Sequence, residues 1–248
     1  MRQLLPLKAV AHALKSVVDY RSTAVRFGLF WIPLLFVLGL AELLIGVPPP
    51  GQPDFGPGKG IELISAAIGL VGVCAMAVGW HRFILRDEMR SPTRLDWQVW
   101  RYLGNSVLIM LIVLVPLIIL AVVLNFLPPV LSILLLPASL IAAVVAIRLS
   151  IKLPAVAVGR TDFSFADAWT ASAGQFWPLA GVVVLNAAIV IGAALLLMST
   201  LWGVDAISPA AAPFVALVII SVLQLFGTMF NAGILTSLYG FFVEKRDY

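Results

Sequence analysis

The sequence contains few charged residues, one cysteine and two histidines. Of its 248 residues, 16 are Lys or Arg and 12 are Asp or Glu. These make up 11% of the chain, whereas soluble globular proteins carry about 25% charged residues. So little charge cannot cover a water-facing surface, which excludes a soluble enzyme and a disordered chain. The lone Cys74 excludes a scaffold of internal disulfides. The two histidines have no carboxylate or cysteine at ligand spacing, which argues against a zinc site.

Hydrophobic residues dominate what is present. They form 62% of the chain, and its mean hydropathy is +1.08. A helix needs about 20 apolar residues to cross a bilayer core, and six runs approach or exceed this length. They lie at about 27–47, 61–80, 107–127, 130–147, 177–199 and 213–243. Each run must be helical, because lipid offers no partner for unpaired backbone groups. We therefore predict an all-α integral membrane protein with six transmembrane helices in a single membrane domain, 1–248.

The six predicted spans pair into three hairpins, which we expect to pack as a six-helix bundle. The predicted turns are a Pro/Gly-rich loop from Val47 to Gly60, a tight turn at Pro128 and Pro129, and a loop from Thr200 to Ala212. Proline cannot donate a backbone hydrogen bond, so prolines inside a span kink the helix. The prolines in this position are Pro33, Pro116 and Pro137.

The basic residues predict the orientation. Every Lys and Arg except Lys59 falls in the N-terminal segment, after the second span, after the fourth span or in the C-terminal tail. By the positive-inside rule, both termini then face the cytoplasm. Each basic cluster lies close to a span end, where anionic lipid headgroups are the nearest partner. The positive net charge is therefore no indication of nucleic-acid binding.

The segment before the first span is amphipathic, and we predict a helix lying in the inner-leaflet interface. One face at helical spacing consists of Leu7, Val10, Ala11, Leu14, Val17 and Val18. The opposite face consists of Lys8, His12, Lys15 and Asp19.

A short motif stands before each odd-numbered span: Ser or Thr, two residues, Asp, then an aromatic residue either directly or one position later. Its copies are Ser16–Tyr20, Thr93–Trp97 and Ser164–Trp169. The hydroxyl of such a motif caps a helix N-terminus, and the carboxylate suits the helix dipole there. The copies predict a parallel threefold repeat over about 1–90, 91–160 and 161–248, with a short interfacial helix introducing each hairpin. The first copy lies inside the amphipathic segment, where a capping role is harder to place.

The region after the fourth span resembles a known family. Arg148–Ser150, Leu153–Arg160, Ser164–Trp169 and Phe176-Trp177 are similar to segments of bacterial six-span proteins related to the membrane domain attached to some glycerophosphoryl diester phosphodiesterases. The resemblance covers the six-span layout and is specific over about thirty residues. It implies location in the bacterial inner membrane. It implies no activity, because the phosphodiesterase chemistry of such proteins belongs to a separate soluble domain.

Polar residues recur along one face of the sixth span. Ser221, Gln224, Thr228 and Asn231 follow helical spacing, and Asn186 lies at similar depth in the fifth span. This candidate intramembrane polar face predicts an amide pair between Asn186 and Gln224. We favour helix adhesion as its role; the alternative is the lining of a path for a polar substrate.

Two further sets of charged residues are candidate sites. Arg82 with Arg86, and Arg148 with Lys152, leave the second and fourth spans at i,i+4 spacing. Such pairs are candidate lipid-phosphate contacts, although positive-inside anchoring explains them as well. Glu42 and Glu62 lie near the outer ends of the first two spans. They are candidate outer acids; we favour solvation at the outer interface, and the alternative is a site that binds a cation or relays protons.

No nucleophile elbow, phosphate-binding loop or dinucleotide fingerprint is present in the sequence. We therefore favour a non-enzymatic inner-membrane protein, without a cofactor, that contacts anionic lipids or acts in a complex with another membrane protein. The alternatives are a small transporter or channel that uses the polar face, and a membrane-embedded enzyme acting on lipid headgroups.

Overall fold

The structure is a computed structural model that describes residues 3–45 and 58–246, and within them all regular structure is helical. The elements are α1 (Pro6–Asp19), α2 (Arg21–Ile45), α3 (Gly58–Arg86), α4 (Trp97–Asn125), the 3-10 helix η1 (Pro129–Leu134), α5 (Leu135–Ser150), α6 (Lys152–Ala157), α7 (Phe165–Ala171), α8 (Phe176–Ile207) and α9 (Ala212–Phe242). Six stretches are long and apolar enough to cross a membrane: α2, α3, α4, η1 to α6, α8 and α9. The predicted class of six-span α-helical membrane protein is confirmed.

The helices extend beyond the apolar runs that predicted them. Helix α4 begins at Trp97, well before the predicted start near 107, and α8 continues to Ile207. The predicted loop from Thr200 to Ala212 is therefore wrong, because only 208–211 separate α8 from α9. A helix can continue past the hydrocarbon boundary, since its backbone is satisfied internally on both sides. The predicted turn at Pro128 and Pro129 is confirmed, whereas 46–57 of the predicted loop Val47–Gly60 lie outside the described residues.

The three prolines predicted to kink helices occupy two different kinds of position. Pro33 lies inside α2 and Pro116 inside α4. Pro137 instead lies in the first turn of α5, which begins at Leu135. The helix η1 runs directly into α5, so Pro137 follows a segment that is already helical. The kink predicted at Pro137 stays a prediction.

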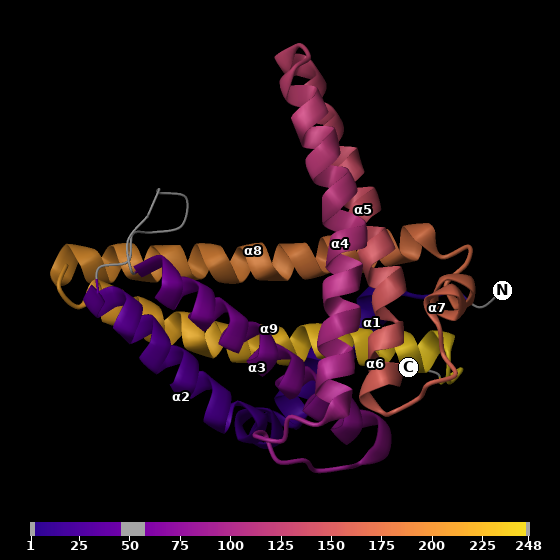
Figure 1. Ribbon diagram of the computed structural model, residues 1–248, viewed down its shortest axis with the longest axis horizontal. Coiled ribbons are helices and arrows are strands. Elements are labelled where there is room, and N and C mark those ends of the chain that lie inside the picture. The colour runs from indigo at the N-terminus through magenta and orange to yellow at the C-terminus, as the bar shows by residue number, and fades with distance from the viewer. Residues whose placement is uncertain (1–2, 46–57, 247–248) are drawn as a thin grey trace.

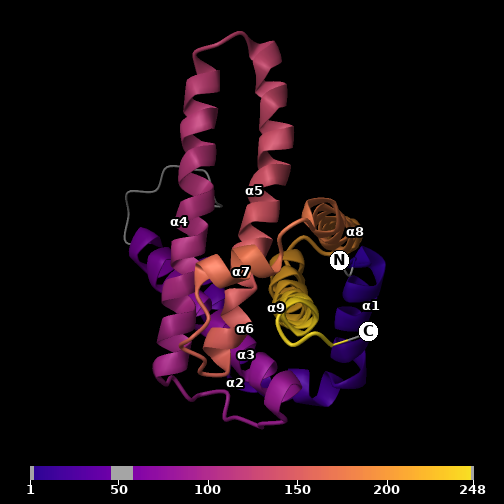
Figure 2. The ribbon, with the colours of Figure 1, turned by 90° about the vertical axis from the view of Figure 1, so that its right-hand side faces the viewer.

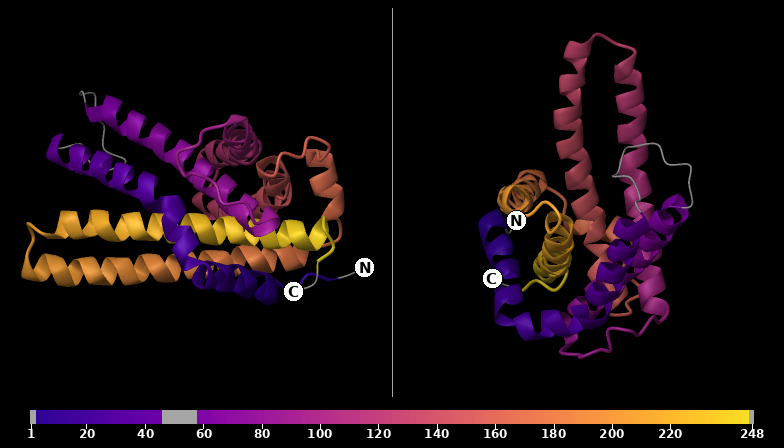
Figure 3. Two further views of the ribbon diagram at one scale, coloured as in Figure 1. Left: turned by 90° about the horizontal axis from the view of Figure 1, so that it is seen from below. Right: turned by 90° about the vertical axis from the view of Figure 1, so that its left-hand side faces the viewer.

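The hairpins do not form one compact six-helix bundle. Helices α8 and α9 run side by side, and the α2–α3 hairpin extends toward the same end of the molecule (Figures 1 and 3). The α4–α5 hairpin points in another direction, so that it stands upright where α8 and α9 are seen end-on (Figure 2). All three hairpins meet at one end, which we call the base. It contains α1, α6, α7 and both described termini (Figures 1 and 2).

The buried core lies at the base. Buried side chains come from α1, the first half of α2, the second half of α3, α6 from Leu153 onward and the second half of α9. Glycines allow close packing there: a Cβ at Gly72 would lie 2.8 Å from the Trp31 ring, and one at Gly79 would lie 2.8 Å from the Phe27 ring. The opposite halves of the hairpins expose apolar side chains, as lipid-facing helices do. Packing between hairpins is thus concentrated at one end.

Helix α1 has three faces instead of the predicted two. Ala9, Val10, Ala13 and Val17 are buried in contacts with α8 and α9. The exposed residues divide into an apolar stripe, Leu7, Ala11, Leu14 and Val18, and a polar stripe, Lys8, His12, Lys15 and Asp19. Part of the predicted apolar face therefore packs against the protein, and the rest is exposed. An exposed apolar stripe beside a charged one suits a helix at a membrane surface.

The three copies of the capping motif adopt three different structures. Ser164 and Asp167 form a full capping box at the start of α7, as predicted. In the second copy Asp96, not Thr93, is the N-cap of α4 and accepts from the Gln98 amide. The first copy caps no helix: Ser16 lies within α1 and donates to the His12 carbonyl oxygen. The threefold repeat therefore stays a prediction.

A fully buried histidine joins three long helices in the core. His81 of α3 lies 2.7 Å from Thr236 Oγ1 through Nδ1 and 3.2 Å from the Tyr102 hydroxyl through Nε2. Thr236 donates its own hydroxyl hydrogen to the Ala232 carbonyl oxygen. His81 Nδ1 must therefore carry the hydrogen that Thr236 accepts, and Nε2 accepts from Tyr102. Both ring nitrogens are occupied, so His81 is not available to a metal.

Candidate functional site

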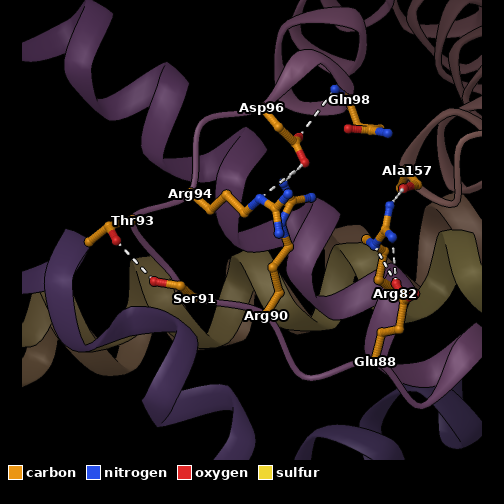
Figure 4. A network of polar contacts seen from close by, with 9 residues as sticks. All are labelled: Arg82, Glu88, Arg90, Ser91, Thr93, Arg94, Asp96, Gln98 and Ala157. Atoms are coloured by element: carbon orange, nitrogen blue, oxygen red, sulfur yellow. Dashed lines mark hydrogen bonds and ion pairs between the residues drawn. The ribbon is translucent and has the colours of Figure 1, made fainter.

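The best-defined polar site is a cavity at the base between α3 and α4. It has a volume of about 510 Å³, and we call it the arginine pocket (Figure 4). The chain leaves α3 through Asp87, whose φ of 54° reverses the backbone. This turn brings the α3–α4 loop back over the end of α3. The lining residues are Arg82, Glu88, Met89, Arg90, Ser91, Arg94, Asp96, Trp97 and Gln98.

Arg82 holds the inner wall of the arginine pocket. Its Nε donates to Glu88 Oε2 at 2.7 Å, and its Nη1 donates to the Ala157 carbonyl oxygen at 3.2 Å. The first contact fixes the loop onto α3, and the second ties α3 to the end of α6. Arg82 is therefore neutralised within the protein.

Arg90 is the most unusual residue in the pocket. Its side chain is only 8% exposed and forms an ion pair with Asp96 (Figure 4). Its Nη1 is buried and has no hydrogen-bond partner among the described residues. Burial, followed by the nearby charges of Arg82 and Arg94, lowers the pKa of Arg90 to about 10. The Arg90 guanidinium thus has a donor left over in a positively charged setting.

The pocket carries more positive than negative charge. Asp96 serves Arg90 and also lies 3.8 Å from Arg94 Nε, while one of its oxygens accepts from the Gln98 amide at the start of α4. Arg94 itself is 70% exposed. Three guanidinium groups thus share two carboxylates, those of Glu88 and Asp96. Such a site favours an anion, and guanidinium groups match the oxygens of phosphate.

Exposed tryptophans surround the base. Trp97 and Trp100 lie in the first turn of α4, and Trp169 and Trp177 lie near α7. Trp97 is 70% exposed and Trp177 is 77% exposed. Tryptophan is enriched where headgroups meet hydrocarbon, because its ring is both apolar and polar. This arrangement suits a pocket at headgroup depth.

The four candidate lipid-phosphate contacts occupy unlike environments. Arg82 points into the protein as described above, while Arg86 is exposed. Arg148 Nη2 donates to the Trp169 carbonyl oxygen at 2.7 Å, and its guanidinium lies 3.5 Å from the centre of the Trp169 ring. Lys152 Nζ lies 3.9 Å from the centre of the Phe165 ring. The i,i+4 pairs therefore do not act as paired cations on one open face.

Sequence reasoning did not select Arg90 and Arg94 as site residues. It counted them only as evidence of orientation, since they follow the end of the apolar run. The available signal was the polar segment that contains both residues and ends in Asp96. Spacing alone could not show that the loop folds back and buries Arg90.

The candidate intramembrane polar face is brought together in part. Asn186 Nδ2 donates to Asn231 Oδ1 at 3.1 Å, so the predicted pairing of Asn186 with Gln224 is wrong. Asn186 lies ten residues into α8 from Phe176, and Asn231 lies eleven residues before the end of α9 at Phe242. The two antiparallel helices therefore place these residues at equal depth. Ser221 and Thr228 donate to carbonyl oxygens of α9 itself.

The candidate outer acids do not assemble a metal site in the described structure. Glu62 pairs with Lys59 at 2.6 Å, so the one basic residue predicted on the outer side neutralises it. Glu42 is half-buried in α2. Within 3–45 and 58–246, no group of three His, Cys, Asp or Glu side chains comes together to hold a metal ion.

Comparisons with protein-family models, with curated proteins and with solved structures found no match to this chain. The fold and the site geometry therefore carry the functional argument, and the resemblance described from the sequence stays a prediction.

Proposed function

We propose that this protein is a non-enzymatic inner-membrane protein that binds anionic lipid headgroups at its cytoplasmic base. The observation that carries the proposal is the arginine pocket, where Arg90 has a buried donor without a partner. A lipid phosphate supplies acceptor oxygens and the missing negative charge. The exposed tryptophans and the two exposed stripes of α1 support placement of the base at headgroup depth.

Anionic lipid is favoured over a soluble anion because of where the pocket lies. The loop from 87 to 96 joins two helices that are each long enough to span a membrane, so the pocket is held close to the bilayer surface. Negative surface potential concentrates there and falls away within about 10 Å. A lipid headgroup also remains bound more readily than a free ion, because its acyl chains stay in the membrane.

The proposal is tested by native mass spectrometry of the full chain in mild detergent. Phosphatidylglycerol and phosphatidylcholine are each titrated into wild-type protein, Arg94→Gln and Arg90→Gln. Wild-type protein should retain phosphatidylglycerol preferentially. Loss of one charge-assisted hydrogen bond should reduce its retention about tenfold in either variant. Arg86→Gln is the matched control, because Arg86 is exposed and does not line the pocket.

Each result decides the proposal. Equal retention of both lipids by wild-type protein contradicts it, and so does an equal loss in Arg94→Gln and Arg86→Gln, which would indicate diffuse surface charge. Arg94 is largely exposed, so Arg94→Gln tests the pocket even if Arg90→Gln unfolds the loop. A thermal unfolding curve without added lipid separates loss of binding from loss of fold.

A further inference from the structure

A second cavity lies within the membrane-spanning part of the molecule. It has a volume of about 430 Å³ and is lined by α3, α4, α8 and α9. We call it the intramembrane cleft. Its aliphatic wall includes Leu70, Val190 and Leu235, and its polar residues include Ser106, Gln224 and Asn231. The volume falls within the range of small-molecule sites, which are mostly apolar with a few placed polar groups.

Some polar side chains of the cleft are hydrogen-bonded within the protein and others are not. Asn231 donates to the Gly227 carbonyl oxygen and accepts from Asn186. Thr228 donates to the Gln224 carbonyl oxygen. Among the described residues no side-chain hydrogen bond is present for Gln224, which is exposed on the cleft side of α9, or for Ser106, which is half-buried. Asn186 Oδ1, beside the cleft, is buried and also without a partner.

Polar side chains at hydrocarbon depth without a hydrogen-bond partner indicate that a ligand supplies one. Gln224 lies in the middle third of α9, far from both ends of the helix. Hydrocarbon cannot satisfy an amide, and helix adhesion satisfies only those groups that reach a neighbouring helix. Adhesion therefore accounts for Asn186 with Asn231 but not for Gln224. A ligand that supplies an oxygen to Gln224 and Ser106 completes the set.

The lining also limits the charge of the occupant. No Asp, Glu, Lys or Arg lines the cleft. Tyr102 also lines the cleft, and its hydroxyl is already bonded to His81. A charged headgroup would enter hydrocarbon depth without a counter-charge, which is strongly unfavourable. The polar part of the ligand is therefore uncharged.

We propose that the intramembrane cleft binds an uncharged, lipid-soluble molecule. Its carbonyl or hydroxyl oxygen hydrogen-bonds with Gln224 and Ser106, and its hydrocarbon part lies along the aliphatic wall. Diacylglycerol and isoprenoid quinones share this chemistry. The cleft has no lining residue in common with the arginine pocket, so this inference is independent of the proposed function.

Photo-crosslinking of the full chain in detergent tests the cleft. The probes are a diazirine-bearing diacylglycerol, a diazirine-bearing quinone analogue and a diazirine-bearing phosphatidylglycerol. We expect one of the two neutral probes to label peptides of α3 or α9 that line the cleft, and the unlabelled parent lipid to compete. Which neutral probe succeeds identifies the source of the ligand.

Substitutions inside and outside the cleft test whether labelling depends on its polar residues. Ser106→Ala and Gln224→Leu should each reduce labelling about tenfold, the loss that follows from removing one useful hydrogen bond. Ser221→Ala is the control, because Ser221 lies on the same face of α9, donates to the Leu217 carbonyl oxygen and does not line the cleft. Arg94→Gln should leave labelling unchanged, which separates failure here from failure of the proposed function.

Four results would overturn the inference. They are labelling by neither neutral probe, labelling that excess parent lipid does not reduce, preferential labelling by phosphatidylglycerol, and equal labelling of Gln224→Leu and wild-type protein. The last result, together with unchanged thermal stability in Ser106→Ala, would leave the polar face with a packing role only.

Discussion

At the scale of single residues, His81 shows how little a residue type says without its neighbours. The sequence argued only against a zinc site at His81, since no carboxylate or cysteine stands at ligand spacing from it. In the structure its ring joins Tyr102 and Thr236 across three helices. The relative positions of α3, α4 and α9 that create these contacts depend on packing at the base. The sequence alone does not show which residues of these helices meet.

Replacing His81 should destabilise the protein. In His81→Leu the Tyr102 hydroxyl loses its acceptor, whereas Thr236 still donates to the Ala232 carbonyl oxygen. One buried hydroxyl without a partner costs about 1–3 kcal/mol. We expect a corresponding drop in the free energy of unfolding, measured by chemical denaturation in detergent. Lys8→Leu, at an exposed position of α1, is the control, and an equal effect of both substitutions would refute the role given to His81.

Arg148 makes a second case at the residue scale. The sequence offered it as a lipid-phosphate contact, yet its guanidinium stacks on Trp169 and donates to the Trp169 carbonyl oxygen and to Ser172. Arg148→Lys keeps the charge but cannot reproduce a planar stack with several donors. We expect faster hydrogen exchange in Phe165–Ala171 in this variant, read by mass spectrometry. Arg86→Lys should leave exchange in that helix unchanged; acceleration in both variants would mean that α7 responds to something other than this contact.

At the scale of elements, α7 is the one place where the sequence motif and the structure agree fully. The capping box of Ser164 and Asp167 satisfies backbone donors that the helix leaves unpaired. The other two copies have the same letters but different surroundings. Ser16 follows residues that already continue a helix, and Thr93 precedes a loop in which Asp96 is better placed to cap. A short motif predicts capping only where the chain enters a helix at that point.

The α7 capping box should make α7 sensitive to acid. Hydrogen bonds from the Ser164 hydroxyl and amide lower the pKa of Asp167 from its ordinary value of 3.8. A carboxyl group with a lowered pKa in the folded state stabilises the fold above its unfolded pKa, and this contribution disappears as the pH falls through the lower, folded value. We expect the stability difference between wild-type protein and Asp167→Asn to be constant near neutral pH and to shrink below about pH 4. Thermal unfolding of both proteins across pH 3 to 7 measures it. A difference that does not change with pH would show that the carboxylate charge is irrelevant to α7.

At the scale of the whole molecule, hydropathy predicted the number of spans and packing decided their arrangement. Six apolar runs are visible because each must satisfy its own backbone in lipid. The directions of the hairpins depend instead on which ends interlock, as Gly72 and Gly79 do with the rings of α2. The outer halves are largely apolar, and their few polar residues do not define a contact stripe on every helix, so no pattern in the sequence distinguishes a compact bundle from hairpins that diverge.

The orientation of the whole molecule is the prediction on which the lipid proposal depends most directly. The α3–α4 loop, the connection from α6 to α7 and both described termini lie at the base (Figure 2), and the described basic residues other than Lys59 belong to segments that meet there. The positive-inside rule predicts that this end faces the cytoplasm. Alkaline phosphatase fused after Ala210, in the turn between α8 and α9, should therefore be active, and the same fusion after Thr161 should be inactive. A green fluorescent reporter at the two positions should give the opposite pattern. The reverse result would place the arginine pocket at the outer surface, away from the anionic lipids of the cytoplasmic leaflet that attract basic residues. An anionic lipid of that leaflet could then not be its ligand.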